Sequence, residues 1–125
     1  MLLLIRGLPG SGKTTLAKDL AETFGFRHFE TDMYFTDEFG NYARDVTKLS
    51  KAHRWCQNKT HEALRDGHHV VVSNTFVRRW EMKPYIAMAK DMGIECHTIE
   101  ATGRYRNTHN VPEDAIQKMA DDFER

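Results

Sequence analysis

The sequence predicts an α/β domain with helices on both faces of a mainly parallel sheet. An apolar run at residues 2–5 leads directly into a glycine-rich segment at residues 7–14, and a helical pattern follows. Residues 70–72 are three consecutive valines, as expected of a central parallel strand covered on both faces. Strand-like and helix-like segments alternate along the chain, with connections long enough for right-handed crossovers.

The glycine-rich segment, Gly7 to Thr14, fits the phosphate-binding pattern G-x-x-x-x-G-K-[ST] at every fixed position, and we call it the P-loop. Its glycines let backbone N–H groups turn towards a phosphate, and the following helix begins at the same point with the positive end of its dipole. Lys13 is expected at the β- and γ-phosphates of a nucleoside triphosphate, and the Thr14 hydroxyl is expected to ligate Mg²⁺. The other loop residues expected to bind the nucleotide are Pro9, Gly10, Ser11 and Gly12.

Apolar periodicity and helix-ending glycines predict the remaining elements. Helices are expected at residues 13–24, 47–66 and 78–92, each followed by a glycine, and a last helix begins near residues 111–114. Strands are expected at residues 2–5, 27–30, 70–72 and 94–99. Pro84 either begins the regular part of the third helix or kinks it.

Polar residues follow two of the expected strands. Asp32 comes after the second strand, and Asn74 and Thr75 come at the end of the third. Because ligands of open parallel sheets bind outside the carboxyl ends of the strands, Asp32 is expected near the P-loop and is a candidate for chemistry. Asn74 could take part in the site or cap the following turn. Arg78 could contact the phosphates of an acceptor or simply be exposed at the start of a helix.

Two further segments bear on the site. Residues 33–42 are rich in aromatic side chains, which could stack on a base or pack onto the domain. A short polar segment at about residues 103–112 contains Arg104 and Arg106, which suit a lid that neutralises a transferred phosphoryl group. The expected organisation is therefore one domain, residues 1–125, with this short lid.

Composition limits the compartment and the partners. The 18 Lys and Arg residues balance 18 Asp and Glu residues, so any nucleic-acid binding must be local. Cys56 and Cys96 form no C-x-x-C pair, which favours reduced thiols and a cytoplasmic setting. The opening apolar run is too short for a signal sequence or a membrane span, and no membrane partner is expected. The histidines lack metal-ligand spacing, so no transition-metal site is predicted. The sequence does not predict an oligomeric state.

The rest of the chain narrows the class of P-loop protein. A GTPase would need an N-K-x-D motif, which the sequence lacks. A motor or AAA-type ATPase would usually have an acidic residue at the end of the third strand, where this chain has Ser73 and Asn74. An acidic residue after the second strand and an arginine-bearing segment before the last helix are typical of a small phosphotransferase, in which a carboxylate activates the acceptor hydroxyl.

Six segments carry a resemblance to a known family. They are residues 10–15, 32–34, 52–55, 74–75, 80–85 and 106–112. On these segments the chain resembles the P-loop polynucleotide 5′-kinase-like domain of ubiquitin-ligase-binding proteins of the Nedd-binding type. More distantly it is similar to the kinase domain of the bacteriophage polynucleotide kinase-phosphatase. The resemblance covers nearly the whole chain and implies a three-layer P-loop kinase fold with strand order 2-3-1-4.

The resemblance also implies an activity, which is Mg²⁺-dependent transfer of the γ-phosphoryl group of ATP to a 5′-hydroxyl of RNA or DNA. Asp32 matches the general base of the family, and Arg106 matches its lid arginine. Thr14 and Thr15 follow Lys13 in the phosphate cradle. Asn74 stands where the family has Asp or Asn near the acceptor hydroxyl and the metal water, and Thr75 beside it is a further candidate for the acceptor side.

The chain departs from this pattern in three places. Phe35 stands where the phage enzyme has an arginine that grips the acceptor phosphate, and the segment before Arg106 is shorter than in relatives. The phage lid has a second arginine shortly after the Arg-Asn pair, where this chain has Thr108, His109 and Asn110, and Arg104 or His109 could replace it. One alternative is a kinase of a nucleoside, sugar or antibiotic hydroxyl, which the zero net charge and Phe35 favour. The other is an ATP-binding regulatory or repair-scaffold module with little transfer, which the short lid favours.

Overall fold

A computed structural model describes residues 1–103 and 111–125 and contains one sheet of parallel strands. The strands are β1 (Leu2–Arg6), β2 (Arg27–Phe29), β3 (Val70–Asn74) and β4 (Cys96–Glu100). Their order is β2-β3-β1-β4, which confirms the order that the resemblance implies. In the centre of the sheet, Leu4 of β1 is in register with Val72 of β3 and Thr98 of β4.

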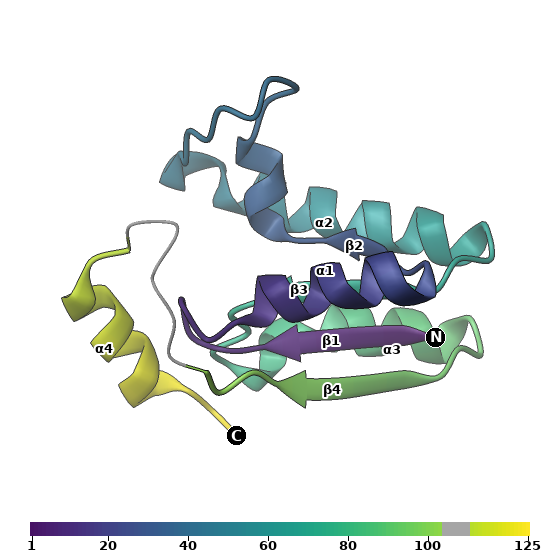
Figure 1. The fold of residues 1–125 in the computed structure, drawn as a ribbon. Helices are drawn as coiled ribbons and strands as arrows, with labels where there is room; N and C mark the ends of the chain where they lie inside the picture. Colours follow the sequence, from purple (N-terminus) through teal and green to yellow (C-terminus); the bar gives the residue numbers. More distant parts are fainter. Residues whose placement is uncertain (104–110) are drawn as a thin grey trace.

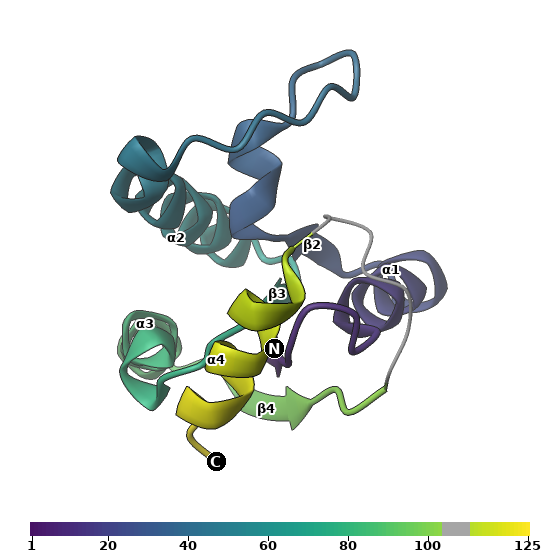
Figure 2. The same cartoon turned by 90° about the vertical axis from the view of Figure 1, so that its left-hand side faces the viewer.

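Helices cover both faces of the sheet (Figure 1). α1 (Lys13–Phe24) lies on one face, and α2 (Leu49–Arg65) and α3 (Lys83–Asp91) lie on the other, as Figure 2 shows. α4 (Glu113–Asp122) packs across the end of the sheet towards which the strands point. This arrangement confirms the predicted three-layer α/β fold and leaves the carboxyl ends of the strands between the layers as the place for a site.

The alternating side chains of β1 explain why its two faces are covered. Leu2 and Leu4 point into a core with Val70, Val72 and Tyr85 on the α2 and α3 side. Leu3 and Ile5 point to the opposite face, where they pack with Val71 and with Ala17 of α1. Since a shift of one residue would exchange the two faces, this packing fixes the pairing of the central strands and the position of the loop that follows β1.

Short 3-10 turns account for most differences from the predicted helix bounds. The helix expected at residues 47–66 begins as a 3-10 turn, Val46–Lys48, and continues as α2. The helix expected at residues 78–92 begins as a 3-10 turn, Arg79–Met82, and α3 follows from Lys83. Pro84 lies in the first turn of α3, where its missing N–H leaves no helical hydrogen bond unmade, so it begins the regular helix.

The strand ends also differ slightly from the prediction. β2 ends at Phe29, and Glu30 leads into a third 3-10 turn, Thr31–Phe35, which carries Asp32. The fourth strand lies at Cys96–Glu100, one or two residues later than expected.

Residues 123–125 fasten α4 to the sheet. The guanidinium of Arg6, at the end of β1, lies 4.2 Å from the centre of the Phe123 ring. The Glu124 N–H donates a hydrogen bond of 2.8 Å to the Val77 carbonyl in the loop after β3. α4 is therefore held beside the loops that follow β1 and β3. None of the helices in residues 1–103 and 111–125 is long and apolar enough to span a membrane.

Candidate active site

The P-loop has a backbone that its glycines permit. Gly10 and Gly12 have φ angles of 81° and 90°, in the left-handed region that other residues rarely adopt. A side chain at Gly7 would collide with Ser11 and would bring its Cβ within 2.7 Å of the Ala101 carbonyl. The observed loop therefore favours glycine at all three positions, and this explains the two fixed glycines of the motif, Gly7 and Gly12.

The two polar side chains after the loop lie beside acidic residues. Lys13 Nζ donates a hydrogen bond of 3.4 Å to the Leu8 carbonyl across the loop. Burial lowers the pKa of Lys13, and the negative charges of Glu30 and Asp32 partly oppose that shift. The Thr14 hydroxyl donates a hydrogen bond of 2.8 Å to Glu30 Oε2. The start of α1 thus presents a cation and a hydroxyl to the same space.

The residues around Thr14 fit a magnesium ion. Mg²⁺ prefers oxygen ligands and is usually held by one or two protein groups together with waters and phosphate oxygens. The Thr14 hydroxyl and the Glu30 carboxylate supply such oxygens next to the P-loop. In the part of the chain that the structure describes, no group of three or more His, Cys, Asp or Glu residues could hold a metal alone. A metal here would therefore depend on the bound phosphates.

Asp32 lies in the 3-10 turn after β2, and neighbouring side chains orient that turn. The Tyr42 hydroxyl donates a hydrogen bond of 3.1 Å to Asp32 Oδ1. Burial and the charge of Asp32 raise the pKa of Tyr42 to about 12, so Tyr42 remains a donor at neutral pH. The Thr31 N–H donates a hydrogen bond of 2.8 Å to Asn74 Oδ1. Asn74 therefore braces the residue that precedes Asp32, a contact that the sequence did not indicate.

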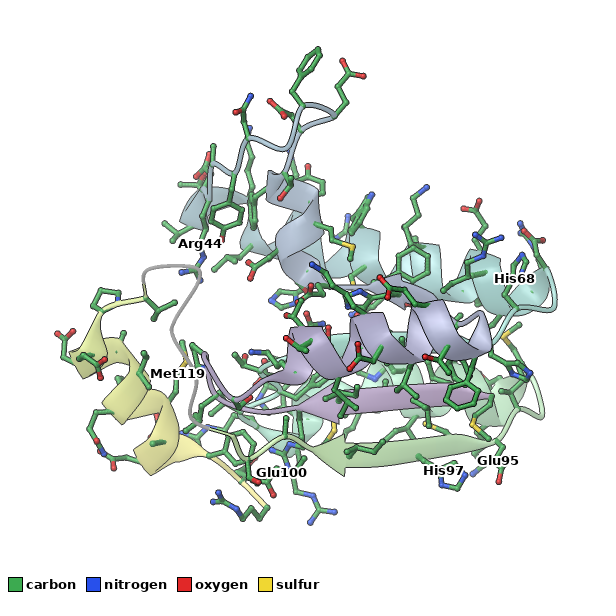
Figure 3. The ribbon with its side chains drawn as sticks, viewed as in Figure 1. Arg44, His68, Glu95, His97, Glu100 and Met119 are labelled. Atoms are coloured by element: carbon green, nitrogen blue, oxygen red, sulfur yellow. The ribbon has the colours of Figure 1, made fainter. Side chains whose placement is uncertain are left out.

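One cavity of about 1250 Å³ joins these groups. Its wall on the P-loop side includes Lys13, Thr14, Glu30 and Asp32. The remaining wall is formed by side chains of α2, of the loops before α2 and α3, and of α4; it includes Arg44, His53, Arg54, Trp80, Pro112 and Met119. Figure 3 shows Arg44 and Met119 on facing sides of this space. Because the volume exceeds that of an ordinary small-molecule site, it has room for a nucleotide and an acceptor together.

The structure brings most of the predicted site residues into this cavity. The lining includes Pro9, Gly10, Gly12, Lys13, Thr14, Thr15, Asp32, Asn74 and Thr75. Ser11 is buried beneath the loop. Arg78 does not line the cavity; it forms ion pairs with Asp122 at 3.4 Å and Glu124 at 4.0 Å. Arg104, Arg106 and His109 lie outside the described residues.

The aromatic residues of segment 33–42 do not all have the same role: some pack onto the domain, and one lines the cavity. Tyr34 packs edge-on against Phe35 and Trp55, and Phe35 is only 8% exposed. Tyr42 lines the cavity, whereas Phe39 does not. Sequence reasoning missed Glu30, Arg44 and Arg54. An acidic residue two positions before Asp32, at the end of a strand, could have indicated Glu30. Arg54 lies in the segment 52–55 that carries the resemblance, whereas no local pattern distinguishes Arg44 from other exposed cations.

The fold and the site together define a class. A P-loop kinase domain has a P-loop at the start of its first helix and a parallel sheet of order 2-3-1-4. This chain has both, with Lys13 and Thr14 at the start of α1. A family model named AAA_33 and described as "AAA domain" matches residues 2–125, and the chain belongs to this family. The family description uses the AAA name, although β3 ends without the acidic residue that is usual in AAA-type ATPases.

Two relatives of known name are similar in sequence. The chain is 35% identical to NEDD4-binding protein 2 of Homo sapiens over 136 residues, which cover 100% of this chain and 8% of that protein. It is 26% identical to the cytidylate kinase of Methanococcus vannielii over 134 residues, covering 95% of this chain and 72% of the relative. The chain therefore spans only a small part of the human relative.

Solved structures share the fold at low sequence identity. A chain of the Pnkp1/Rnl/Hen1 RNA repair complex aligns with a TM-score of 0.75 at 16% identity, covering 98% of this chain and 43% of that chain. A sugar kinase from Janibacter sp. HTCC2649 aligns with a TM-score of 0.69 at 18% identity, covering 99% and 78%. A gluconokinase from Sinorhizobium meliloti 1021 aligns with a TM-score of 0.62 at 18% identity, covering 98% and 74%. The fold is thus shared by kinases of different acceptors.

Proposed function

We propose that this domain transfers the γ-phosphoryl group of ATP to the 5′-hydroxyl of a polynucleotide. The observation that carries the proposal is that the P-loop, the Asp32 carboxylate, Arg44, Arg54 and Trp80 all line one cavity. Similarity to NEDD4-binding protein 2 along the whole of this chain supports it, as does the resemblance of six segments to the polynucleotide 5′-kinase-like family. The free thiols of Cys56 and Cys96 suit a cytoplasmic enzyme.

The P-loop side would bind the donor. Backbone N–H groups of the loop and the start of α1 would cradle the phosphates, and Lys13 would contact the β- and γ-phosphates. Mg²⁺ bound with ATP would offset the charge of the phosphates, and Thr14 would hold it. In this proposal Arg106 stabilises the moving phosphoryl group from the lid, and Arg104 contacts the nucleotide.

Asp32 would act on the acceptor. The Asp32 carboxylate, in the turn after β2 and near Lys13, would accept the proton of an attacking hydroxyl. Asn74 would contribute by holding the Thr31 N–H and so the turn that carries Asp32. Thr75 would line the acceptor side. An acceptor contact from Arg78 would require that side chain to leave Asp122 and Glu124.

The wall opposite the P-loop favours a polynucleotide acceptor. Phe35 is buried in the 3-10 turn and offers no charge to a phosphate. Arg44 and Arg54 line the cavity instead and could bind the backbone phosphate of an acceptor. Trp80 lines the same cavity and is 64% exposed, so its ring is available for stacking on a base. Contacts from a few cavity residues are compatible with a chain of zero net charge.

A small-molecule kinase is the second candidate, and the similarity to a cytidylate kinase over 95% of the chain favours it. An acceptor screen separates the two. The protein is incubated with Mg²⁺ and γ-labelled ATP, and the acceptors are a 5′-hydroxyl oligonucleotide, the same oligonucleotide already 5′-phosphorylated, cytidine, CMP and gluconate. We expect label only on the 5′-hydroxyl oligonucleotide. Label on a small acceptor alone supports the second candidate, and ATP binding without any transfer supports a regulatory module.

Replacing Asp32 tests its assignment as the base. Asp32→Asn should reduce transfer by about 10²-fold while ATP binding is retained, since only proton acceptance is lost. Asp19→Asn, on the exposed side of α1, removes the same charge away from the cavity and should leave transfer unchanged. Full activity of Asp32→Asn would exclude Asp32 as the base.

A further inference from the structure

Glu30 is a mostly buried carboxylate that lies between β2 and the P-loop. Its side chain is 11% exposed, and Oε2 accepts the hydrogen bond from the Thr14 hydroxyl. Oε1 lies 3.6 Å from His28 Nε2, and burial lowers the pKa of that imidazole. Among the residues that the structure describes, no lysine or arginine lies within ion-pair distance of Glu30, although its charge acts on Lys13 nearby. Buried charges in proteins are usually paired or coordinate metals, so this carboxylate needs an explanation.

The neighbouring strand shows what Glu30 could replace. In many P-loop proteins a loop Ser or Thr and an aspartate at the end of a strand together hold the magnesium ion. In this chain β3 ends with Ser73 and Asn74, and both are already engaged. The Ser73 hydroxyl is 2.7 Å from His28 Nε2, and Asn74 accepts from the Thr31 N–H. The acid that faces the P-loop threonine therefore comes from the end of β2.

We propose that Glu30 is the acidic residue beside the magnesium site and fills the position for which β3 offers no acid. An ionised carboxylate only accepts hydrogen bonds, so the Thr14 proton points towards Glu30. The lone pairs of the Thr14 oxygen are thereby left for a metal ion. Glu30 is thus a positioning residue that orients the metal ligand and adds negative charge beside it. This inference rests on the use of Mg²⁺-ATP in the proposed function and does not depend on the acceptor.

The charge of Glu30 gives the proposal a distinctive signature. Without a metal ion, the carboxylate lies near the ATP phosphates and repels them. With Mg²⁺ present, the same carboxylate favours the complex, because it orients Thr14 and attracts the cation. Removing the charge should therefore weaken ATP binding when Mg²⁺ is present and should not weaken it when the metal is absent. A residue that merely supports the loop would affect ATP binding equally with and without metal.

The test measures the binding of a non-hydrolysable ATP analogue by calorimetry, once in Mg²⁺ and once in EDTA. In Glu30→Gln we expect affinity in Mg²⁺ to fall by about tenfold or more, as for other residues that orient metal ligands. In EDTA we expect unchanged or tighter binding. Glu22→Gln, on the exposed side of α1, is the matched control and should behave as the unchanged protein in both conditions.

Two outcomes would overturn the proposal. Equal weakening in Mg²⁺ and EDTA would make Glu30 a structural support, and unchanged binding in Mg²⁺ would remove it from the metal site. If the amide variant does not fold, Glu30→Asp retains the charge but shortens the side chain, and it should weaken binding only in Mg²⁺. Because no acceptor is needed, the result is separate from the acceptor screen: failure to label any acceptor would refute the proposed transfer and leave the measured role of Glu30 intact.

Discussion

The two halves of the cavity are built differently. On the donor side, the backbone of one continuous segment forms the P-loop, and the glycines of that segment determine its shape. On the side that we propose binds the acceptor, side chains come from separate places, including the turn after β2, the start of α2 and the loop after β3. A change on the donor side therefore removes an interaction that no neighbour can replace, whereas changes on the acceptor side are shared among several groups.

The largest effect should come from the donor side. Lys13→Met keeps the aliphatic length but removes the charge at the β- and γ-phosphates, and we expect transfer to fall by about 10³-fold. Steady-state kinetics with the acceptor found in the screen measures it. Lys18→Met, on the exposed side of α1, is the control and should retain activity. If Lys13→Met lost less activity than an acceptor-side variant such as Asp32→Asn, the contrast between the halves would be wrong.

Arg6 joins the two halves, and its loss should mainly affect stability. It ends β1, and its Nε and Nη2 donate hydrogen bonds of 3.1 and 2.6 Å to the Phe76 carbonyl. Phe76 has a φ of 45°, which is unusual for a residue other than glycine, so this loop needs such support. Arg6→Met should lower the free energy of unfolding by about 3 kcal/mol, since buried carbonyls lose charged donors.

Urea unfolding of Arg6→Met provides the measurement. Arg27→Met, at an exposed position of the edge strand β2, should change the free energy of unfolding by less than about 0.5 kcal/mol. Equal stability of the two variants would show that the loop after β3 holds its shape without β1.

A smaller effect is expected for Asn74, which supports the acceptor side. Asn74→Ala leaves the Thr31 N–H without its 2.8 Å acceptor and should cost about 1 to 2 kcal/mol of stability. Transfer should also fall, because the loosened turn carries Asp32, while ATP binding should remain. Thermal unfolding and kinetics are compared with Asn58→Ala, on the exposed side of α2. Lost ATP binding would instead assign Asn74 to the donor side.

The same difference explains what could be predicted from the sequence. The P-loop is a local structure whose residue pattern follows from its backbone, so Gly7 to Thr14 could be placed without any tertiary contact. The strands and helices followed from periodicity because β1 and β3 are buried on both faces. The strand order came from the resemblance, since periodicity does not specify which strands are neighbours.

The acceptor side could be predicted only in part. The position of Asp32 followed from a general property of parallel sheets. The ion pairs of Arg78 depend on the path of the chain after α4, which no local pattern describes. The contact between Glu30 and Thr14 joins residues of two elements, and it depends on how α1 packs beside β2. Such pairings arise from tertiary structure, and one sequence does not contain them as a motif.

The smallest effect is expected for Tyr42, which contacts Asp32 through one hydroxyl. Tyr42→Phe should reduce transfer by about three- to tenfold, which corresponds to one hydrogen bond of about 1 kcal/mol.

The pKa of Tyr42 is raised to about 12 in the folded protein, above the value near 10 that is usual for an unfolded chain. The folded state thus favours the protonated phenol, and this contribution to stability is fully present below about pH 10 and is lost as the pH rises towards 12. The difference in unfolding free energy between the unchanged protein and Tyr42→Phe should shrink over that range, and phenolate absorbance should show one fewer late-titrating tyrosine in the variant. If the tyrosine missing from the titration of Tyr42→Phe were instead one that titrates near pH 10, Asp32 would not hold the Tyr42 proton. The acceptor side would then rely on its other contacts alone.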